Sequence, residues 1–466
     1  MKRIILFLIL TGLCAIAEAE VKQVKIDPGK KFQTLQGYGQ GNMEQTTPVW
    51  YKRYGKAGVE KIADTLYTLK NDGLGLNICR YPMPAADDPN HNHMRRLPKM
   101  ANKPFEYEDG KFNWDGHEDV LWLGKGAADR GAIMWASWYG IPYWLSTSGC
   151  AAGSKDGKSN NLIAGKEKRF IKHVMDVLIH FRDQWGIEFD YVAPINEPEA
   201  DWWKAGGGQP GSHVSAEQAV ILYRELYDSL KKQKYDAKLI AYDAAYTNTT
   251  EYLKELLKTD LKDKLDVFGC HQYITEIASM QEWAAIAKKH KKPLWMTEWG
   301  DWVNVKKNNA NQTKQMMLYA NKLHESFEIL QSNAWIMWEA GFIFNAEEGG
   351  LEKRKSYWAI AHYSRHVRPG FTRVEAIYKG DDCKTTAWTK KEEGKAKLVI
   401  VSVNATDSLC DVEYDLSQLA KKNSLLQIRQ SSSEKNYELS GKNESSGNIL
   451  KVTLPKYSVT TVEIEY

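Results

Sequence analysis

The stretch Tyr191-Val192-Ala193-Pro194-Ile195-Asn196-Glu197-Pro198 is a short apolar run that ends in an amide, a carboxylate and a proline. Proline has no backbone N–H for a neighbouring strand, so Pro198 stops the strand and leaves Glu197 at its carboxyl end. The run is the fourth of eight that alternate with amphipathic segments, the pattern of repeated strand and helix units around a parallel sheet. This alternation decides the fold class.

The eight apolar runs predict eight strands, which we place at residues 35–41, 74–81, 132–138, 189–195, 238–243, 266–273, 293–298 and 333–338. The segments between them carry apolar stripes at three- and four-residue spacing, which indicate helices. These stripes are Val59, Ile62, Leu66 and Leu69; Ala219, Leu222, Leu226 and Leu230, behind a capping box of Ser215 and Gln218; and Met316, Ala320, Leu323, Phe327 and Leu330. Eight such units predict a (β/α)8 barrel, a TIM barrel of the α/β class, over residues 35–367.

A second domain follows the barrel. After Gly370 the helical period stops, and strand-like runs such as 398–404 and 450–454 are joined by polar turns. We therefore expect a β-sandwich over residues 368–466. Residues 20–34 also read as a strand, which we expect to join this sandwich before the chain enters the barrel, and no flexible linker separates the two parts.

The first 19 residues have the composition of a secretory signal. Lys2 and Arg3 precede an apolar run over 4–16, and Ala17-Glu18-Ala19 offers small residues where a signal peptidase cleaves. We expect cleavage after Ala19 and a secreted or periplasmic protein. No second run of membrane length follows, so the sequence predicts no membrane span.

Charge and composition exclude several classes of function. Lys and Arg total 63 against 59 Asp and Glu, a near balance that gives no reason to expect nucleic acid as the partner. The excess lies instead in aromatic residues, with 17 Trp and 24 Tyr. We expect a monomer.

The cysteines and histidines indicate no metal site. Five cysteines remain after residue 19 without any Cys-x-x-Cys pair, which excludes a zinc knuckle. His362 and His366 share a helical face but lack an evident third ligand. Cys383 and Cys410 flank strands of the C-terminal region, and the sequence leaves open whether they form a disulfide or stay free. No metal and no cofactor are expected.

Two glutamates end strands that lie across the barrel mouth from each other. Glu197 ends the fourth strand, and Glu298 ends the seventh within Leu294-Trp295-Met296-Thr297-Glu298-Trp299. A barrel presents its reactive groups at the carboxyl ends of its strands. Hydrolysis of a glycoside with retention needs two carboxyl groups facing one cleft, one to protonate the leaving oxygen and one to attack the anomeric carbon.

These motifs give the sequence its resemblance to a known family. Asn196-Glu197-Pro198 with Thr297-Glu298-Trp299 resembles the clan A glycoside hydrolases, and within that clan the chain resembles glycoside hydrolase family 30 over essentially its whole length after residue 19. The further motifs that carry the match are Leu74-Gly75-Leu76-Asn77-Ile78-Cys79-Arg80-Tyr81, Pro142-Tyr143-Trp144-Leu145, Tyr357-Trp358-Ala359-Ile360 and Ser364-Arg365-His366-Val367-Arg368-Pro369-Gly370.

The resemblance implies roles for the matching residues. Glu197 would be the general acid/base and Glu298 the nucleophile, while Asn196 would hydrogen-bond the sugar 2-hydroxyl. Arg80 and Tyr273 match positions that keep the nucleophile ionised and oriented.

Other residues are expected to bind the sugar. Trp338 matches the family's sugar platform, and Trp202 and Trp203 lie close enough after Glu197 to serve likewise. His271 and Asp243, near strand ends, are candidates for bonding substrate hydroxyls. For each tryptophan, packing in the core is as good an interpretation from sequence alone.

The loops resemble the endo-β-1,6-galactanase branch of the family. The similar stretches are 142–154 with Asn161-Leu162, and 202–209. The branch's usual Gln-Glu-Gly-Cys-His is replaced by Gln209-Pro210-Gly211-Ser212-His213, and its usual tryptophans are missing from 39–44. The resemblance implies that the partner is an oligosaccharide or polysaccharide substrate. The leading hypothesis is a secreted retaining β-1,6-galactanase acting on arabinogalactan side chains. The alternatives are a family 30 enzyme for another linkage, of the β-1,6-glucanase, xylanase, β-xylosidase or β-glucosidase type, and a non-catalytic glycan-binding protein.

Overall fold

The computed structural model describes residues 21–466 except 43–46, 97–102, 302–308, 345–350, 379, 381, 393, 420–423, 441–444 and 447. The signal peptide expected at residues 1–19 lies outside this described part. Among the described residues, no helix combines the length and the apolar character needed to cross a membrane.

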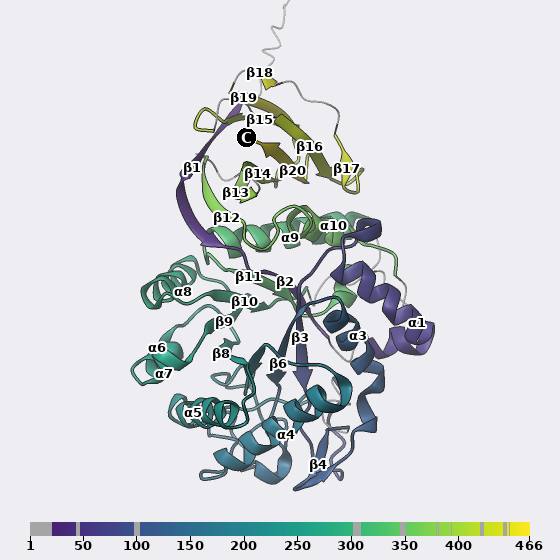
Figure 1. The fold of residues 1–466 in the computed structure, drawn as a ribbon, viewed down its shortest axis with the longest axis vertical. Coiled ribbons are helices and arrows are strands. Elements are labelled where there is room, and N and C mark those ends of the chain that lie inside the picture. The colour runs from purple at the N-terminus through teal and green to yellow at the C-terminus, as the bar shows by residue number, and fades with distance from the viewer. Residues whose placement is uncertain are drawn as a thin grey trace, which may run out of the picture.

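Eight parallel strands close into a barrel, which confirms the predicted fold (Figure 1). In chain order they are β2 (Gly37–Gly41), β3 (Ile78–Met83), β6 (Ile133–Trp138), β7 (Tyr191–Ala193), β8 (Lys238–Ala244), β9 (Val267–His271), β10 (Leu294–Glu298) and β11 (Ala334–Met337). Each lies within or overlaps one predicted run. Every described strand residue except Ile133 and Lys238 is buried, because helices cover the outside of the barrel.

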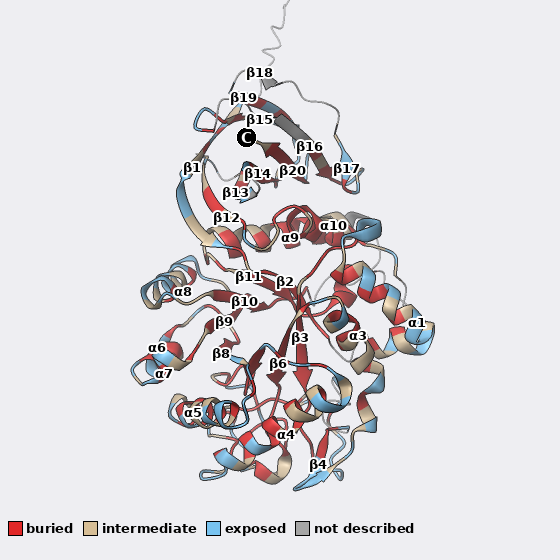
Figure 2. Ribbon diagram, in the orientation of Figure 1, coloured by how far each residue is buried: buried red, intermediate tan, exposed pale blue. Residues whose placement is uncertain are grey.

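The helices surround the barrel with their apolar stripes turned inward, as the buried faces in Figure 2 show. They are α1 (Thr47–Tyr67), α3 (Glu118–Asp129), α4 (Glu167–Trp185), α5 (Ala216–Lys232), α6 (Glu251–Leu257), α7 (Leu261–Lys264), α8 (Ile277–His290), α9 (Asn309–Glu328) and α10 (Lys355–Ser364). Short elements between them are η1 (Lys70–Asp72), η2 (Asp115–His117), η3 (Tyr143–Leu145), η4 (Ala340–Ile343) and the pair β4 (Glu106–Glu108) and β5 (Lys111–Phe112).

The predicted stripes are buried with one exception. Leu69 is 45% exposed, because α1 ends at Tyr67 and the chain has already left the helix. At the start of α5, the Ser215 side chain accepts the backbone N–H of Gln218, as a capping box requires. The reciprocal bond is absent there, since Gln218 Nε2 donates instead to Leu162 O at 3.1 Å and Glu167 Oε1 at 2.9 Å.

The second strand begins later than its apolar run. Residues 74–77 connect α1 to β3, with the N–H groups of Leu74 and Leu76 donating back to Thr65 O and Leu66 O. Gly75 takes a φ of 62°, a left-handed turn that a side chain would disfavour. The strand then continues to Met83, two residues beyond the prediction.

The expected sandwich is formed by one sheet of ten strands, in the order β17-β16-β20-β14-β13-β12-β1-β15-β19-β18. Their bounds are β1 (Lys22–Thr34), β12 (Thr372–Ile377), β13 (Cys383–Glu392), β14 (Lys395–Asn404), β15 (Cys410–Asp415), β16 (Ser424–Ser431), β17 (Glu438–Leu439), β18 (Ser445–Ser446), β19 (Ile449–Leu454) and β20 (Ser458–Glu465). Ser402 of β14 and Tyr414 of β15 are distant in this order, yet their hydroxyls lie 2.7 Å apart. The sheet therefore curls over itself around its own apolar core.

The first strand of the chain lies inside this sheet, as predicted. β1 pairs antiparallel with β12 and parallel with β15. Cys383 and Cys410 are both buried and free, so the structure has the thiol form of this pair rather than the disulfide. A hydrogen bond between the two thiols raises the pKa of Cys383 and lowers that of Cys410.

Helices α9 and α10 lie between the barrel and the curled sheet (Figure 1). Phe327 of α9 meets Trp388 of β13 edge to face, with ring centroids 5.1 Å apart. His362 uses both ring nitrogens on sheet hydroxyls, 2.8 Å to Thr461 Oγ1 and 3.0 Å to Ser431 Oγ. The barrel core thus continues into the sheet without a solvent layer.

We expect Trp388→Ala to destabilise the protein by about 3 to 5 kcal/mol, because it opens a cavity at this fully buried junction. Leu439→Ala is the control in the same sheet, since Leu439 is 63% exposed and its truncation should cost within about 0.5 kcal/mol. Urea unfolding measures both. A Trp388→Ala loss as small as the control's would contradict a shared core.

Candidate active site

The carboxyl ends of the barrel strands surround a cavity of about 620 Å³. Its lining contains Glu197, Glu298, Asn196, Tyr273, Trp202, Trp203 and Trp338 from the sequence prediction, with Tyr139, Tyr246, Arg96, Ala152 and residues 207–209 in addition. The three other predicted residues, Arg80, His271 and Asp243, are fully buried beneath it. The structure therefore brings all ten predicted residues together, in two layers.

Arg80 is the centre of the lower layer. Its Nη1 donates to Glu298 Oε2, and its Nη2 donates to Asn196 Oδ1 at 2.6 Å and Asp243 Oδ2 at 2.7 Å. The guanidinium also lies over the Trp135 ring, 4.8 Å from its centroid. Burial alone would lower the pKa of Arg80, but the charges of Asp243 and Glu298 raise it well above its ordinary value.

Glu298, at the end of β10, accepts hydrogen bonds from two tyrosines in addition to Arg80. Tyr273 OH donates to Oε1 at 2.8 Å, and Tyr139 OH donates to Oε2 at 3.1 Å. These donors fix the carboxylate from both sides. The sequence analysis did not identify Tyr139, although this residue directly follows the third predicted strand.

Glu197 stands on a turn of unusual backbone conformation. Its φ is 48° and that of Asp243, on the neighbouring strand, is 59°. The Glu197 N–H donates to Asp243 O at 3.0 Å, and Trp203 Nε1 donates to Glu197 O at 3.0 Å. Left-handed backbone at residues other than glycine costs about 1 to 3 kcal/mol and tends to occur at functional sites. Trp203, only 5% exposed, thus supports the turn as well as lining the cavity.

Burial gives the Glu197 carboxyl its electrostatic character. Desolvation raises the pKa of Glu197, and the negative charges of Glu298 and Asp243 raise it further, whereas His271 opposes the shift. His271 Nδ1 lies 2.8 Å from Glu197 Oε1, and its Nε2 lies 3.1 Å from Asp243 Oδ1. The proton of Glu197 is therefore held more tightly than in a solvated glutamic acid.

His271 is a buried cation. Desolvation would lower its pKa, but the charge of Glu298 and the hydrogen bond to Asp243 raise the pKa of His271 to about 10. As an imidazolium it donates from both nitrogens, one to each carboxylate. One oxygen of Glu197, one of Glu298 and a His271 nitrogen lie within 4.8 Å of one another. A protonated imidazole offers no lone pair, so this trio does not make a metal site at neutral pH.

Aromatic rings form the walls of the cavity. Trp202 is 41% exposed and packs beside Tyr246, with ring centroids 5.2 Å apart. Trp338 stacks on Phe342 with ring centroids 5.7 Å apart, and the Arg96 guanidinium lies 6.0 Å from the centroid of the Trp338 ring. Such indole surfaces suit the apolar C–H face of a pyranose.

The two loops that resemble one branch of the family are packed together. Ser154 and Lys204 form an isolated parallel β-bridge, and the Ala205 N–H donates to Ser154 O at 2.9 Å. Gly153 has a φ of 137°, and a Cβ there would lie 2.0 Å from Trp203 O, so only glycine permits this approach. Ser212 Oγ accepts hydrogen bonds from Ile141 N–H and from Asn161 Nδ2, both at 3.1 Å. Segment 209–213, which differs from the usual sequence of the galactanase branch, is thus bonded to the residues beside these loops.

The barrel and its paired carboxylates define the class of protein as a glycoside hydrolase. The profile of O-Glycosyl hydrolase family 30 matches residues 21–313, more than half of the chain, and the protein belongs to this family.

Relatives of known activity are distant. An endo-beta-1,6-galactanase of Hypocrea rufa is 23% identical over 435 residues, which are 84% of this chain and 83% of that protein. The glucuronoxylanase XynC of Bacillus subtilis (strain 168) is 24% identical over 365 residues, 76% of this chain and 78% of that protein. The crystal structure of the glycoside hydrolase family 30 subfamily 8 xylanase Xyn30A from Clostridium acetobutylicum superposes with a TM-score of 0.72 and 19% identity, covering 95% of this chain and 100% of that one.

The charge on His271 predicts a pH-dependent stability. Because its pKa is about 10 in the folded state and about 6.5 in the unfolded chain, the folded state holds a proton that the unfolded state loses between these values. This contribution is complete below pH 6.5 and lost as pH rises through 10, with a slope of at most about 1.4 kcal/mol per pH unit.

The measurement is the unfolding free energy of the wild type minus that of His271→Gln from pH 6 to 10.5. It should fall with rising pH. His290→Gln is the control, because burial lowers the pKa of His290 and both of its states are neutral above pH 7. A wild-type-to-His271→Gln difference that stays constant across this range would show that His271 is neutral.

Proposed function

We propose that this family 30 enzyme is a secreted, retaining endo-β-1,6-galactanase that cleaves the β-1,6-linked side chains of arabinogalactan, with Glu298 as nucleophile and Glu197 as acid/base. The observation that carries the mechanism is the proximity of one oxygen of each glutamate, within 4.8 Å. Retaining enzymes place their carboxyl groups about 5 to 5.5 Å apart, whereas inverting enzymes leave about 6.5 to 9.5 Å for a water molecule.

In the first step, Glu298 attacks the anomeric carbon and forms a glycosyl ester. The bond between that carbon and the glycosidic oxygen breaks, and the leaving oxygen takes the proton of Glu197. In the second step, Glu197 removes a proton from water, whose oxygen attacks the anomeric carbon and releases Glu298. The proton and both carboxylates are restored, and the product keeps the β configuration.

The surroundings of the two glutamates support these roles. Three donors, Arg80 and two tyrosines, converge on Glu298 and hold it in one orientation for attack. Glu197 hydrogen-bonds to His271, and its raised pKa suits a group that must carry a proton near neutral pH. Two carboxyl groups with different surroundings can divide acid and nucleophile between them.

Asn196 is suited to bind the sugar undergoing attack. Its Oδ1 is held by Arg80, so the amide Nδ2 is the end that remains for a ligand in the cavity. A donor to the 2-hydroxyl strengthens as positive charge develops on the ring. Arg80, His271 and Asp243 then act beneath the substrate, as positioning residues for Asn196 and the two glutamates.

The choice of galactan rests on the sequence. The stretches 142–154 and 202–209 resemble the galactanase branch, and the Hypocrea rufa relative spans more of this chain than the glucuronoxylanase does. The glucuronoxylanase keeps xylan as the second candidate. Export fits both, because these polysaccharides lie outside the cell and residues 1–19 have the pattern of a signal peptide.

The deciding experiment is product analysis of residues 20–466 on β-1,6-galactan, β-1,6-glucan and glucuronoxylan in parallel. We expect cleavage of galactan alone. An endo attack should release oligomers of mixed length, and NMR should detect the β-anomer of the product before the α-anomer. Glu298→Gln should keep the fold and glycan binding but lose turnover. Cleavage of xylan or glucan instead would replace the substrate and keep the mechanism; binding without any cleavage would favour a glycan-binding protein.

Removal of the acid should depend on the leaving group. Glu197→Ala should lower kcat/KM about 10²- to 10⁴-fold on galactan, whose alcohol leaving group needs a proton, and far less on aryl galactosides with acidic phenols. Azide should restore part of the activity on the activated substrates by attacking the glycosyl ester. Equal losses on both substrates, without rescue, would remove Glu197 from the acid/base role.

A further inference from the structure

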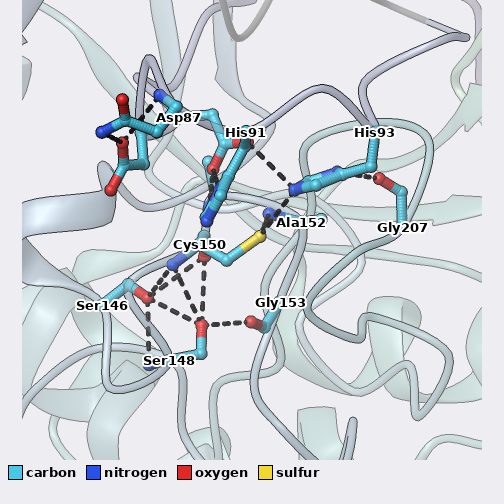
Figure 3. Close-up of polar contacts among 12 residues, drawn as sticks. Asp87, His91, His93, Ser146, Ser148, Cys150, Ala152, Gly153 and Gly207 are labelled. Carbon is cyan, nitrogen blue, oxygen red and sulfur yellow. Dashed lines mark hydrogen bonds and ion pairs between the residues drawn. The ribbon is translucent and has the colours of Figure 1, made fainter.

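Four side chains with metal-binding atoms meet in the loops that also carry part of the cavity lining. Asp87, His91 and His93 come from the loop after β3, and Cys150 comes from the loop after β6 and η3 (Figure 3). One donor atom of each lies within 4.8 Å of the others. The Asp87 and Cys150 residues are buried, and the His91 side chain is 34% exposed.

Three of the distances between donor atoms are close to the edges of a tetrahedral zinc site. Asp87 Oδ2 lies 3.2 Å from His91 Nδ1 and 3.2 Å from His93 Nε2, and Cys150 Sγ lies 3.5 Å from His93 Nε2. In a tetrahedral zinc site with bonds of about 2.0 to 2.3 Å, neighbouring donor atoms are about 3.3 to 3.7 Å apart. The remaining pairs of donor atoms lie within 4.8 Å of one another.

Hydrogen bonds from outside the cluster orient its members. His93 Nδ1 lies 2.7 Å from Gly207 O and must donate to it, because a carbonyl has no proton. A neutral His93 ring then directs the lone pair of Nε2 at Asp87 and Cys150. Ala151 N–H donates to Asp87 Oδ1 at 2.9 Å. Histidines and carboxylates that bind metals are held in this manner.

The sulfur has surroundings that suit a thiolate. Ala152 N–H donates to Cys150 Sγ at 3.4 Å, and the Gly206 N–H is also directed at it. Burial raises the pKa of Cys150, whereas these two N–H donors act to lower it.

We propose that Asp87, His91, His93 and Cys150 bind one zinc ion in a four-coordinate structural site. Sulfur, two imidazoles and a carboxylate are zinc ligands, whereas calcium and magnesium select oxygen. The protein supplies all four ligands, which leaves no open position for a substrate or a reactive water. The ion is therefore outside the glycosidase chemistry.

The site would brace the substrate cleft. It joins the loop after β3 to the loop after β6, and through His93 it also holds Gly207 in the loop after β7. Arg96, Ala152, Gly207 and Gly208 from these three loops line the cavity. A single metal ion that cross-links these loops would hold this wall of the cleft in one conformation.

The test is metal binding by the full chain. After chelation and dialysis, zinc should return to one equivalent per chain by elemental analysis and should raise the Tm, since it binds only the folded site. Cobalt(II) should give the intense visible bands of a tetrahedral site and a near-ultraviolet charge-transfer band from the thiolate. Cobalt that shows neither feature, or zinc lost on dialysis, would overturn the site.

Matched variants locate the ion. His91→Ala should weaken zinc binding at least tenfold, while His290→Ala, at another histidine that retains some exposure, should not. Cys150→Ser should remove the cobalt charge-transfer band, while Cys410→Ser should keep it. Because His91 is exposed, its variant tests the site even where Cys150→Ser does not fold. The assignment would be refuted if His91→Ala held as much zinc as His290→Ala and Cys150→Ser held as much as Cys410→Ser.

The Glu197–His271–Glu298 cluster is the competing location, and Glu298→Gln separates the two. Zinc affinity and the cobalt band should survive in Glu298→Gln, because the proposed site lies outside that cluster; their loss would move the ion to the active site.

The proposal that zinc braces the cleft rests on the proposed function, and it predicts that zinc removal raises KM for the polysaccharide more than it lowers kcat. Unchanged KM would refute bracing while the binding results stand independently.

Discussion

The buried guanidinium of Arg80 is the constraint on which the site depends. A cation without exposure to water must be neutralised by anions and satisfied by acceptors, and its partners come from other strands: Asn196 after β7, Asp243 on β8 and Glu298 on β10. Removing one partner would leave a buried charge uncompensated. The contacts that hold the Glu298 carboxylate therefore belong to a network that links residues on or just after four strands of the barrel.

The charges beneath the cavity explain why one glutamate is suited to carry a proton. Arg80 and His271 are cations, while Asp243 and Glu298 are anions, so the group is neutral when Glu197 is protonated. Ionising Glu197 adds an unbalanced negative charge in a buried place, which is the direction in which its pKa is shifted. The two glutamates have different surroundings, although both are the same side chain at the end of a strand, and the proposed division of roles between them rests on this difference.

Sequence patterns predicted the features that follow from residues close together in the chain, namely the barrel strands and the polar groups at their ends. Buried strands give apolar runs, and strand ends present polar groups to one face, which is why Glu197 and Glu298 could be paired before any coordinates. Tyr139 does not ionise at ordinary pH and so gave no such signal. Asp87 and Cys150 are far apart in sequence and lack the short spacing of common zinc motifs, so only the folded loops bring them together. The curl of the second sheet was also beyond prediction, because apolar alternation does not encode which strands become neighbours.

The position of β1 has a consequence for biosynthesis. Lys25 pairs with Ile377 on one side and Asp415 on the other, so the first strand has no partners until nearly the whole chain exists. At about 5 to 20 residues per second, residue 415 follows residue 25 from the ribosome by roughly 20 to 80 s. During that interval an unpaired strand edge is open to pairing with other chains. The domain that is translated last is therefore completed by β1, a strand that is translated before the whole barrel.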